Sequence, residues 1–307
     1  MRMADGPFRI LTRADFDGIV SALLLREAGV VDRVAFAHPR DVEAGRMFVD
    51  GETVLATLPH RPEAGLCFNH RHDPPVVGAN HTGGSAALST ARVIYDHYGA
   101  GAFSGVSAGL LDAVDRCTAG HLDEAEIRNP AGWVMLNFLM DARTGLGRFS
   151  DFAVSNTQLM LDMVGYLREP DPERVLARPD VHERVVLYRD HARAFADQIK
   201  RCTAIHGRIG VIDLRYEDFI FCGNRFLVYA LVPEIDISIH VYWGRERQNT
   251  VIVAGRSVLG GCPEVDLGRQ MAAFGGGGHP GAGSCQVDNG AAARILDDLT
   301  SRIAAEL

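Results

Sequence analysis

The chain has 307 residues, of which 47% are hydrophobic and 23% are charged, and its formal net charge is −8. This size and apolar content suit two domains with large cores, and no apolar run is as long as a membrane span. The net negative charge argues against a protein that binds long nucleic acid through a broad basic surface, because such binding depends on neutralising many phosphates. The start of the chain lacks a signal-peptide pattern, so we expect a cytoplasmic protein.

The first predicted strand, residues 8–12, leads into two carboxylates and a glycine at Asp15, Asp17 and Gly18. An apolar helix is predicted to follow from Ile19. In open α/β sheets ligands bind at the carboxyl ends of the strands, so both carboxylates are candidate ligands for a divalent cation. A helix cap at Asp15 followed by an ordinary turn explains the same residues. Both interpretations stay open on this stretch alone.

Alternating strands and helices fill the rest of the first half of the chain. The predicted strands lie at 33–37, 53–56 and 65–68, and the predicted helices at 84–97, 108–117, 133–140 and 151–167. This alternation favours an α/β domain with a mainly parallel sheet flanked by helices. Pro170 and Pro172 then mark a boundary, and the charged stretch 181–205 predicts a long connecting helix.

The hydrophobic period changes after residue 206, where strand-like segments dominate. The predicted strands lie at 209–214, 225–232, 235–242 and 250–254, and the predicted helices at 268–274 and 291–305. These elements predict a smaller mixed α/β domain. The expected organisation is therefore a larger domain at 1–168, a linker and connecting helix at 169–206, and the smaller domain at 207–307.

A run of glycines, Gly275 to Gly278, stands directly before His279. Consecutive glycines let the backbone approach a ligand and present N–H groups to an anion, and the histidine adds a donor. We therefore expect Gly276, Gly277, Gly278 and His279 to form a phosphate cradle, with a flexible turn as the alternative.

A second candidate contact for an anion lies upstream, at Arg256 and Ser257, which follow the end of the predicted strand 250–254. Arg256 has the geometry to bind a phosphate through two hydrogen bonds, and Ser257 offers a hydroxyl at the same loop. An exposed, solvated arginine is the alternative interpretation.

Taken together, the segments 15–18, 276–279 and 282–283 resemble the DHH phosphoesterase superfamily, in the branch that carries the DHH-associated C-terminal domain. The resemblance covers nearly the whole chain. It implies an Mn²⁺- or Mg²⁺-dependent phosphoesterase that cleaves short oligonucleotides, phosphoadenosine phosphate or dinucleotides. Many relatives of this length are called exopolyphosphatase-related. It also implies that 1–168 is a DHH-like domain and that 207–307 is the DHH-associated, substrate-binding domain.

The Asp-His-His signature of this family is altered here to Asn69-His70-Arg71, with His72 as a further histidine beside it. One of the two metal positions of the family corresponds to Leu11, Asp15 and about Thr57. Two of its three ligands are therefore missing. Asp15 stays a candidate ligand, or a general base if it binds no metal.

The other metal position corresponds to Asp17, Thr57, His70 and Asp115, so the resemblance keeps three ligands. Two carboxylates and a neutral imidazole can hold Mn²⁺ with open sites for water. The resemblance thus implies one Mn²⁺ or Mg²⁺ ion, bound by Asp17, His70 and Asp115 and with Asp15 nearby.

These features predict a metal-dependent phosphoesterase that hydrolyses short nucleotide phosphodiesters or related small phosphate esters in an interdomain cleft. Asp15 and His70 are the expected catalytic residues, and Arg256, Ser257 and the 276–279 segment are the expected substrate contacts. The alternative is a non-catalytic nucleotide- or phosphate-binding protein with a decayed metal centre. The expected partner is a small nucleotide or short oligonucleotide, without long nucleic acid or a membrane; the oligomeric state is open, with a homodimer as one alternative.

Overall fold

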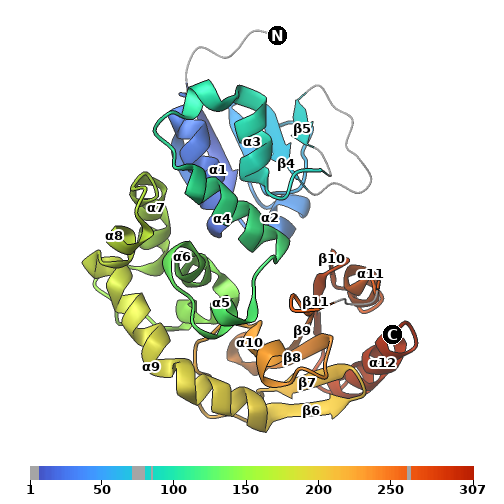
Figure 1. The fold of residues 1–307 in the computed structure, drawn as a ribbon. Coiled ribbons are helices and arrows are strands. Elements are labelled where there is room, and N and C mark those ends of the chain that lie inside the picture. Colours follow the sequence, from blue (N-terminus) through green and yellow to red (C-terminus); the bar gives the residue numbers. More distant parts are fainter. Residues whose placement is uncertain (1–6, 71–79, 84–85, 261–263) are drawn as a thin grey trace. The chain divides into compact units, whose positions relative to one another are not determined.

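The computed structural model describes residues 7–70, 80–83, 86–260 and 264–307. The chain divides into two compact units (Figure 1). Unit 1 comprises Met1–His121 and Pro130–Leu187, and unit 2 comprises Leu122–Asn129 and Tyr188–Leu307. The segment 169–206, predicted as a linker and connecting helix, is thus divided between the two units.

Unit 1 is built on a five-stranded sheet in the order β2-β1-β3-β4-β5. The strands are β1 (Phe8–Thr12), β2 (Val31–Phe36), β3 (Thr53–Ala56), β4 (Leu66–Asn69) and β5 (His81–Gly83). Every pair in this sheet is parallel, which confirms the predicted α/β class. All four residues of β3 are buried, as expected for a central strand of a sheet that is covered on both faces.

Helices cover this sheet. Those within unit 1 are α1 (Phe16–Glu27), α2 (Pro39–Glu43), α3 (Thr90–Tyr98), α4 (Ala108–Ala119), α6 (Gly132–Met140), α7 (Asn156–Tyr166) and α8 (Pro172–Leu176). Helix α1 is buried from Phe16 to Leu25 and packs against β1, β2 and β3. Val42 of α2 joins a separate buried cluster with Leu11 and Leu55 of the sheet. Helices α1, α3 and α4 contact one another (Figure 1).

Helix α9 (Pro179–Cys202) begins in unit 1 and ends in unit 2. Unit 2 also contains the short helices α5 (Glu124–Arg128) and α10 (Leu227–Leu231). Among the described residues, no helix combines the length and the apolar character needed to cross a membrane.

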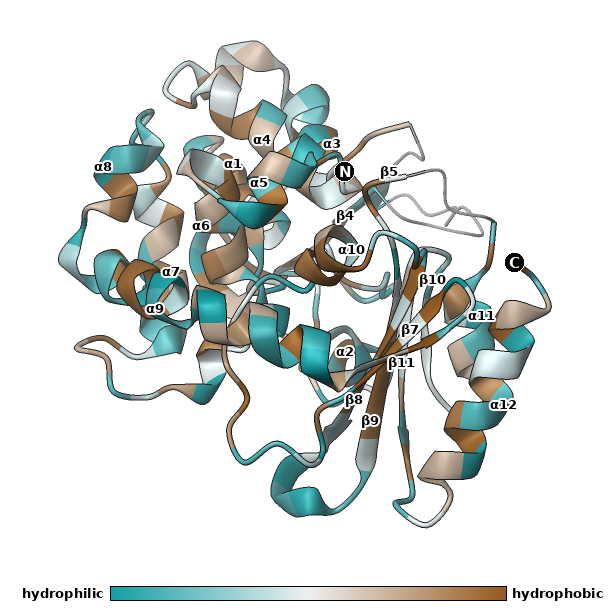
Figure 2. Ribbon diagram, turned by 60° about the horizontal axis from the view of Figure 1, so that its bottom comes forward, coloured by the Kyte–Doolittle hydropathy of each residue, from teal (hydrophilic) through white to brown (hydrophobic). Residues whose placement is uncertain are grey.

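The sheet of unit 2 has six strands in the order β10-β11-β9-β8-β7-β6. They are β6 (Thr203–His206), β7 (Ile209–Asp213), β8 (Ile237–Trp243), β9 (Thr250–Arg256), β10 (Gly277–His279) and β11 (Ala282–Val287). Only β7 and β8 pair in parallel, so the sheet is mixed, as predicted. Helices α11 (Leu267–Ala272) and α12 (Ala292–Ala304) share one buried core with the strands. Figure 2 shows hydrophobic residues concentrated in these strands, whereas α12 carries residues of both kinds.

Two predicted elements of unit 2 are wrong. Residues 225–232 were expected as a strand, but Leu227–Leu231 form helix α10. A short apolar run fits a buried helix as well as a strand, and here Asn224 accepts a hydrogen bond from the backbone N–H of Phe226 just before the helix, at 2.8 Å. The last residues of the predicted connecting helix instead form β6, because Thr203–His206 pair with the edge of β7.

Candidate active site

The start of α3 contacts three of the side chains that the sequence singled out, namely Asp17, His70 and Asp115. Ser89 caps this helix and accepts a hydrogen bond from the backbone N–H of Arg92 at 3.0 Å. Asp17 of α1 accepts from the N–H groups of Thr90 at 3.0 Å and Ala91 at 2.8 Å. The start of a helix leaves such N–H groups without partners and carries positive partial charge. This helix end therefore fixes the Asp17 carboxylate.

His70, which the family resemblance groups with Asp17, lies beside it. Its Nδ1 atom is 3.5 Å from Asp17 Oδ2 and 2.9 Å from the hydroxyl oxygen of Thr90. Burial, together with the negative charge of Asp15, raises the pKa of Asp17 to about 6, although hydrogen bonds from Ala91 and Thr90 oppose this shift. The pair thus combines a buried carboxylate with an imidazole that is held in place by a hydroxyl.

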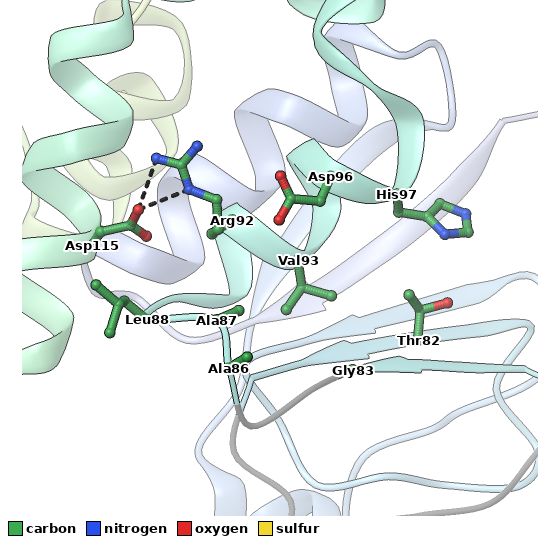
Figure 3. A pocket seen from close by; sticks show the side chains of 10 residues that line it. All are labelled: Thr82, Gly83, Ala86, Ala87, Leu88, Arg92, Val93, Asp96, His97 and Asp115. Atoms are coloured by element: carbon green, nitrogen blue, oxygen red, sulfur yellow. Dashed lines mark hydrogen bonds and ion pairs between the residues drawn. The ribbon is translucent and has the colours of Figure 1, made fainter.

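Asp115 of α4 reaches the same helix turn, but as part of an ion pair. The Ser89 hydroxyl donates to Asp115 Oδ1 at 2.6 Å. Two nitrogens of Arg92, Nε and Nη2, each lie 2.8 Å from Oδ2. Figure 3 shows Arg92 pointing from α3 toward this carboxylate. Both oxygens of Asp115 are therefore engaged by the start of α3.

Asp15 occupies the position of a helix cap. Its side chain accepts from the backbone N–H of Gly18 at 3.0 Å, and α1 begins one residue after Asp15. Arg13 forms an ion pair with the other carboxylate oxygen, with Nε 3.0 Å away. The sequence left Asp15 open as a metal ligand or a helix cap, and its contacts in the structure are those of a helix cap.

The two non-ligand residues at the predicted metal positions have structural roles. Leu11 is buried in the cluster around α2. Thr57 has a φ of 61°, a left-handed conformation that is unusual for a β-branched residue. Its hydroxyl accepts from the backbone N–H of Arg13 at 3.2 Å and so ties the end of β3 to the turn after β1.

A divalent metal ion does not fit this arrangement of the described side chains. Within residues 7–70, 80–83, 86–260 and 264–307, no group of three or more His, Cys, Asp or Glu residues is placed to hold a metal. Asp17 and His70 are adjacent, but Asp115 is paired with Arg92 and Asp15 with Arg13. Arg71 and His72 of the altered signature lie outside the described residues. We therefore assign no chemical step to a metal ion here.

A cavity of about 600 Å³ opens beside the Arg92 and Asp115 pair. Its lining consists of Thr82, Gly83, Ala86, Ala87, Leu88, Arg92, Val93, Asp96, His97 and Asp115 (Figure 3). Ligand sites for small molecules have this range of volumes. Sequence reasoning missed Arg92 here. The Ser89-Thr90 pair before a helical segment was a capping signal, but nothing local linked Arg92 to an acid on another helix.

In unit 2 the glycine run is partly an edge strand, because Gly277–His279 pair with β11. A Cβ atom on Gly276 would lie 2.2 Å from the carbonyl oxygen of Ser284, and one on Gly278 would lie 2.2 Å from that of Ala282. Gly277 has no such neighbour within 4 Å. Gly276 and Gly278 are thus required for close backbone packing, whatever else the run does.

The different surroundings of Gly276 and Gly277 predict different stabilities for their alanine variants. Gly276→Ala is expected to lower the free energy of unfolding by about 2 kcal/mol or more, because the new methyl group would overlap the backbone carbonyl of Ser284, which is fixed within β11. Gly277→Ala is the matched control and should change stability by less than about 0.5 kcal/mol. Urea denaturation of both variants checks the pair, and equal losses would contradict the packing role of Gly276.

Arg256 and His279 lie on either side of Gly281. The backbone N–H of Arg256 donates to the Gly281 carbonyl at 3.0 Å, and the N–H of Gly281 donates to His279 Nδ1 at 3.1 Å. A Cβ on Gly281 would be 3.3 Å from His279 Cε1 and 3.6 Å from Arg256 Nη2. Two predicted substrate contacts are therefore brought together. The Ser257 hydroxyl instead accepts from the N–H of Leu259 at 3.1 Å, within a turn.

Comparison with known proteins identifies the family. No protein-family model and no curated protein sequence matches the chain. Among solved structures, the chain is similar to PggH, a pGpG-specific phosphodiesterase from Vibrio cholerae, with 38% identity, a TM-score of 0.80, and coverage of 98% of this chain and 100% of PggH. An exopolyphosphatase-related protein from Bacteroides fragilis shares the fold at 12% identity and a TM-score of 0.54, over 97% of this chain and 92% of that one. The extent of the match to PggH confirms the resemblance of the motifs, and the chain belongs to the DHH phosphoesterase superfamily.

Proposed function

We propose that this protein is a phosphodiesterase that hydrolyses short guanine dinucleotides of the pGpG type. Water adds to the phosphorus of the single internucleotide bond, the bond from phosphorus to the 3′ oxygen of the 5′ nucleotide breaks, that oxygen takes up a proton, and two GMP molecules result. The observation that carries the proposal is the 38% identity with a pGpG-specific phosphodiesterase over 98% of this chain. Two groups of residues, one in each unit, support it further.

In unit 1 we assign proton transfer to His70, with Asp17 as the residue that positions it. A histidine beside a carboxylate is a suitable acid or base near neutral pH. The 3.5 Å separation of His70 Nδ1 from Asp17 and its 2.9 Å contact with Thr90 support this assignment. Asp15 is less suited to act as a base, because Gly18 and Arg13 already engage its oxygens.

In unit 2 we assign phosphate binding to Arg256 and His279, the two side chains beside Gly281. A guanidinium and an imidazole N–H are strong donors for phosphate oxygens. With Nδ1 of His279 accepting from Gly281, the neutral imidazole carries its proton on Nε2 and can donate there.

The purified full-length protein tests this proposal when it is offered pGpG, the corresponding adenine dinucleotide and inorganic polyphosphate. The reactions are run with EDTA, with Mg²⁺ and with Mn²⁺, and products are separated by chromatography. We expect GMP from pGpG and much slower conversion of the other two substrates. Tight binding of pGpG without products under every condition would favour the non-catalytic alternative.

Arg256→Ala is expected to weaken pGpG binding by roughly tenfold to a hundredfold, the usual effect of losing a hydrogen bond to a charged group. Calorimetry in a His70→Ala background measures binding without turnover. Arg245→Ala is a matched control in the same unit, because the Arg245 side chain is 92% exposed. Equal affinities for the Arg256 and Arg245 variants would refute the assigned role of Arg256.

A further inference from the structure

We propose that a cavity within unit 2 is a second ligand site, which binds a small organic anion that carries a flat aromatic ring. The cavity has a volume of about 350 Å³, and its lining residues come from α5, α9, α10 and the segments next to them (elements labelled in Figure 1). All of these residues belong to unit 2, and none of them takes part in the proposed cleavage of pGpG. The inference is therefore independent of the proposed function.

Helix α9 gives the cavity an aromatic wall. Tyr188, Ala192 and Phe195 follow one another at helical spacing and line the cavity from one face of this helix. The Phe195 ring packs directly on Gly223, because a Cβ atom on that glycine would lie 2.2 Å from the ring. Tyr188 and Phe195 are each only 6% exposed, so both rings are held in place before a ligand binds. Such a wall suits the flat apolar part of a small molecule.

Hydrogen bonds fix the part of the lining that comes from α5 and α10. The side-chain amide of Asn224 donates to the carbonyl oxygen of Ile127 at 3.1 Å. Arg128 of α5 donates to the carbonyl oxygen of Ala230 in α10, and its Nε atom is 2.7 Å from a carboxylate oxygen of Glu124. Helices α5 and α10 also contact each other. The cavity therefore has defined walls without a ligand.

The charged groups at this cavity are positive. Arg128 and Arg193 line it, and none of the described lining residues is acidic. Arg193 is exposed and forms no ion pair with a described residue, although Asp190 and Asp197 lie about one turn away on the same helix. The whole chain has a net charge of −8, so two guanidinium groups at one cavity are a local exception. They favour an anionic ligand, because guanidinium groups bind phosphate and carboxylate oxygens strongly.

The volume of the cavity limits the size of this ligand. About 350 Å³ lies at the lower end of the range for small-molecule sites, so the cavity suits one aromatic group with one anionic group rather than a dinucleotide. A nucleoside monophosphate and an aromatic carboxylate share this chemistry. The anionic group binds Arg193, and the ring lies against Phe195.

Calorimetric titration of the full-length Arg256→Ala variant tests the site, because this background weakens nucleotide binding at the phosphate contact proposed above. The probes are GMP and 4-hydroxybenzoate. Guanosine and 4-hydroxybenzamide are their neutral counterparts, and inorganic phosphate lacks the ring. We expect at least one of the two aromatic anions to bind with a Kd below about 1 mM, and about tenfold or more tightly than its neutral counterpart and than phosphate. The anion that binds identifies the source of the ligand.

Two variants then locate this binding in the cavity. Arg193→Met removes the charge and keeps a long side chain, so it should weaken binding by about tenfold. Ala192→Trp fills the cavity from an exposed position and should abolish binding. Arg189→Met is the matched control, because Arg189 is exposed on the same helix but does not line the cavity, and it should change nothing.

Failure of both aromatic anions to bind would overturn the proposal, and so would binding that either Arg193→Met or Ala192→Trp leaves unchanged. Both substitutions are at exposed positions, so we expect both variants to fold, and circular dichroism checks this. Because no turnover is measured, a failure to cleave pGpG would refute the proposed function without affecting this result.

Discussion

Replacing Asp17 by alanine is expected to lower the free energy of unfolding by about 2–4 kcal/mol, because two backbone N–H groups lose their acceptor at a buried helix start. Asp17 accepts from both Thr90 and Ala91, and only 7% of its surface is exposed. The same variant should hydrolyse pGpG at least about a hundredfold more slowly, because His70 loses the carboxylate beside it.

Urea denaturation and turnover measurements on the same preparations separate these two effects. Asp17→Asn keeps one acceptor oxygen and should lose about half as much stability as Asp17→Ala. Asp32→Ala changes a carboxylate that is more than half exposed, so it controls for the general effect of removing a negative charge. An Asp17→Ala protein as stable as the Asp32→Ala control would contradict the role of Asp17 as the acceptor for the N–H groups of Thr90 and Ala91.

Acidification from pH 7 to pH 5 is expected to lower the free energy of unfolding by about 2 kcal/mol through His240 alone. Burial, reinforced by the positive charge of Arg225, lowers the pKa of His240 to about 4. Its Nδ1 atom is 3.2 Å from the Tyr242 hydroxyl, and its buried Nε2 has no hydrogen-bond partner among the described residues. The folded pKa lies below the unfolded value, so the unfolded chain takes up the proton first and stability falls as pH decreases.

His240→Gln removes this titration while keeping a polar side chain beside Tyr242. Urea denaturation of both proteins at several values between pH 7 and pH 5 gives the comparison. The wild type should lose about 2 kcal/mol more than the variant over this range. Parallel profiles would show that His240 is not held neutral by the fold.

Local sequence patterns were sufficient for most of the architecture. The apolar run at 8–12 and the acidic turn after it predicted β1 and a buried helix behind it, although α1 begins at Phe16 rather than Ile19 and so includes Asp17. The alternation of strands and helices predicted the parallel sheet. The prediction of a strand at 225–232 was wrong because the conformation of this segment depends on Asn224 and on packing in unit 2. Neither of these alters the hydrophobic pattern of the segment itself.

The contacts of the candidate site depend on residues far apart in the sequence. Asp17 and Ala91 are separated by 74 positions, and Arg92 and Asp115 by 23. A family pattern names residues by type and cannot show that Arg92 already neutralises Asp115. The glycine run is a second example, because the sequence does not distinguish glycines that approach an anion from glycines that pack against β11.

The most direct test of the central claim is the conversion of pGpG by the full-length protein compared with its His70→Ala variant. We predict that the wild type releases two GMP molecules for each pGpG consumed and that the variant, with intact folding and pGpG binding, is at least about a hundredfold slower. Equal rates for the two proteins, or binding of pGpG without any release of GMP by the wild type, would contradict the account.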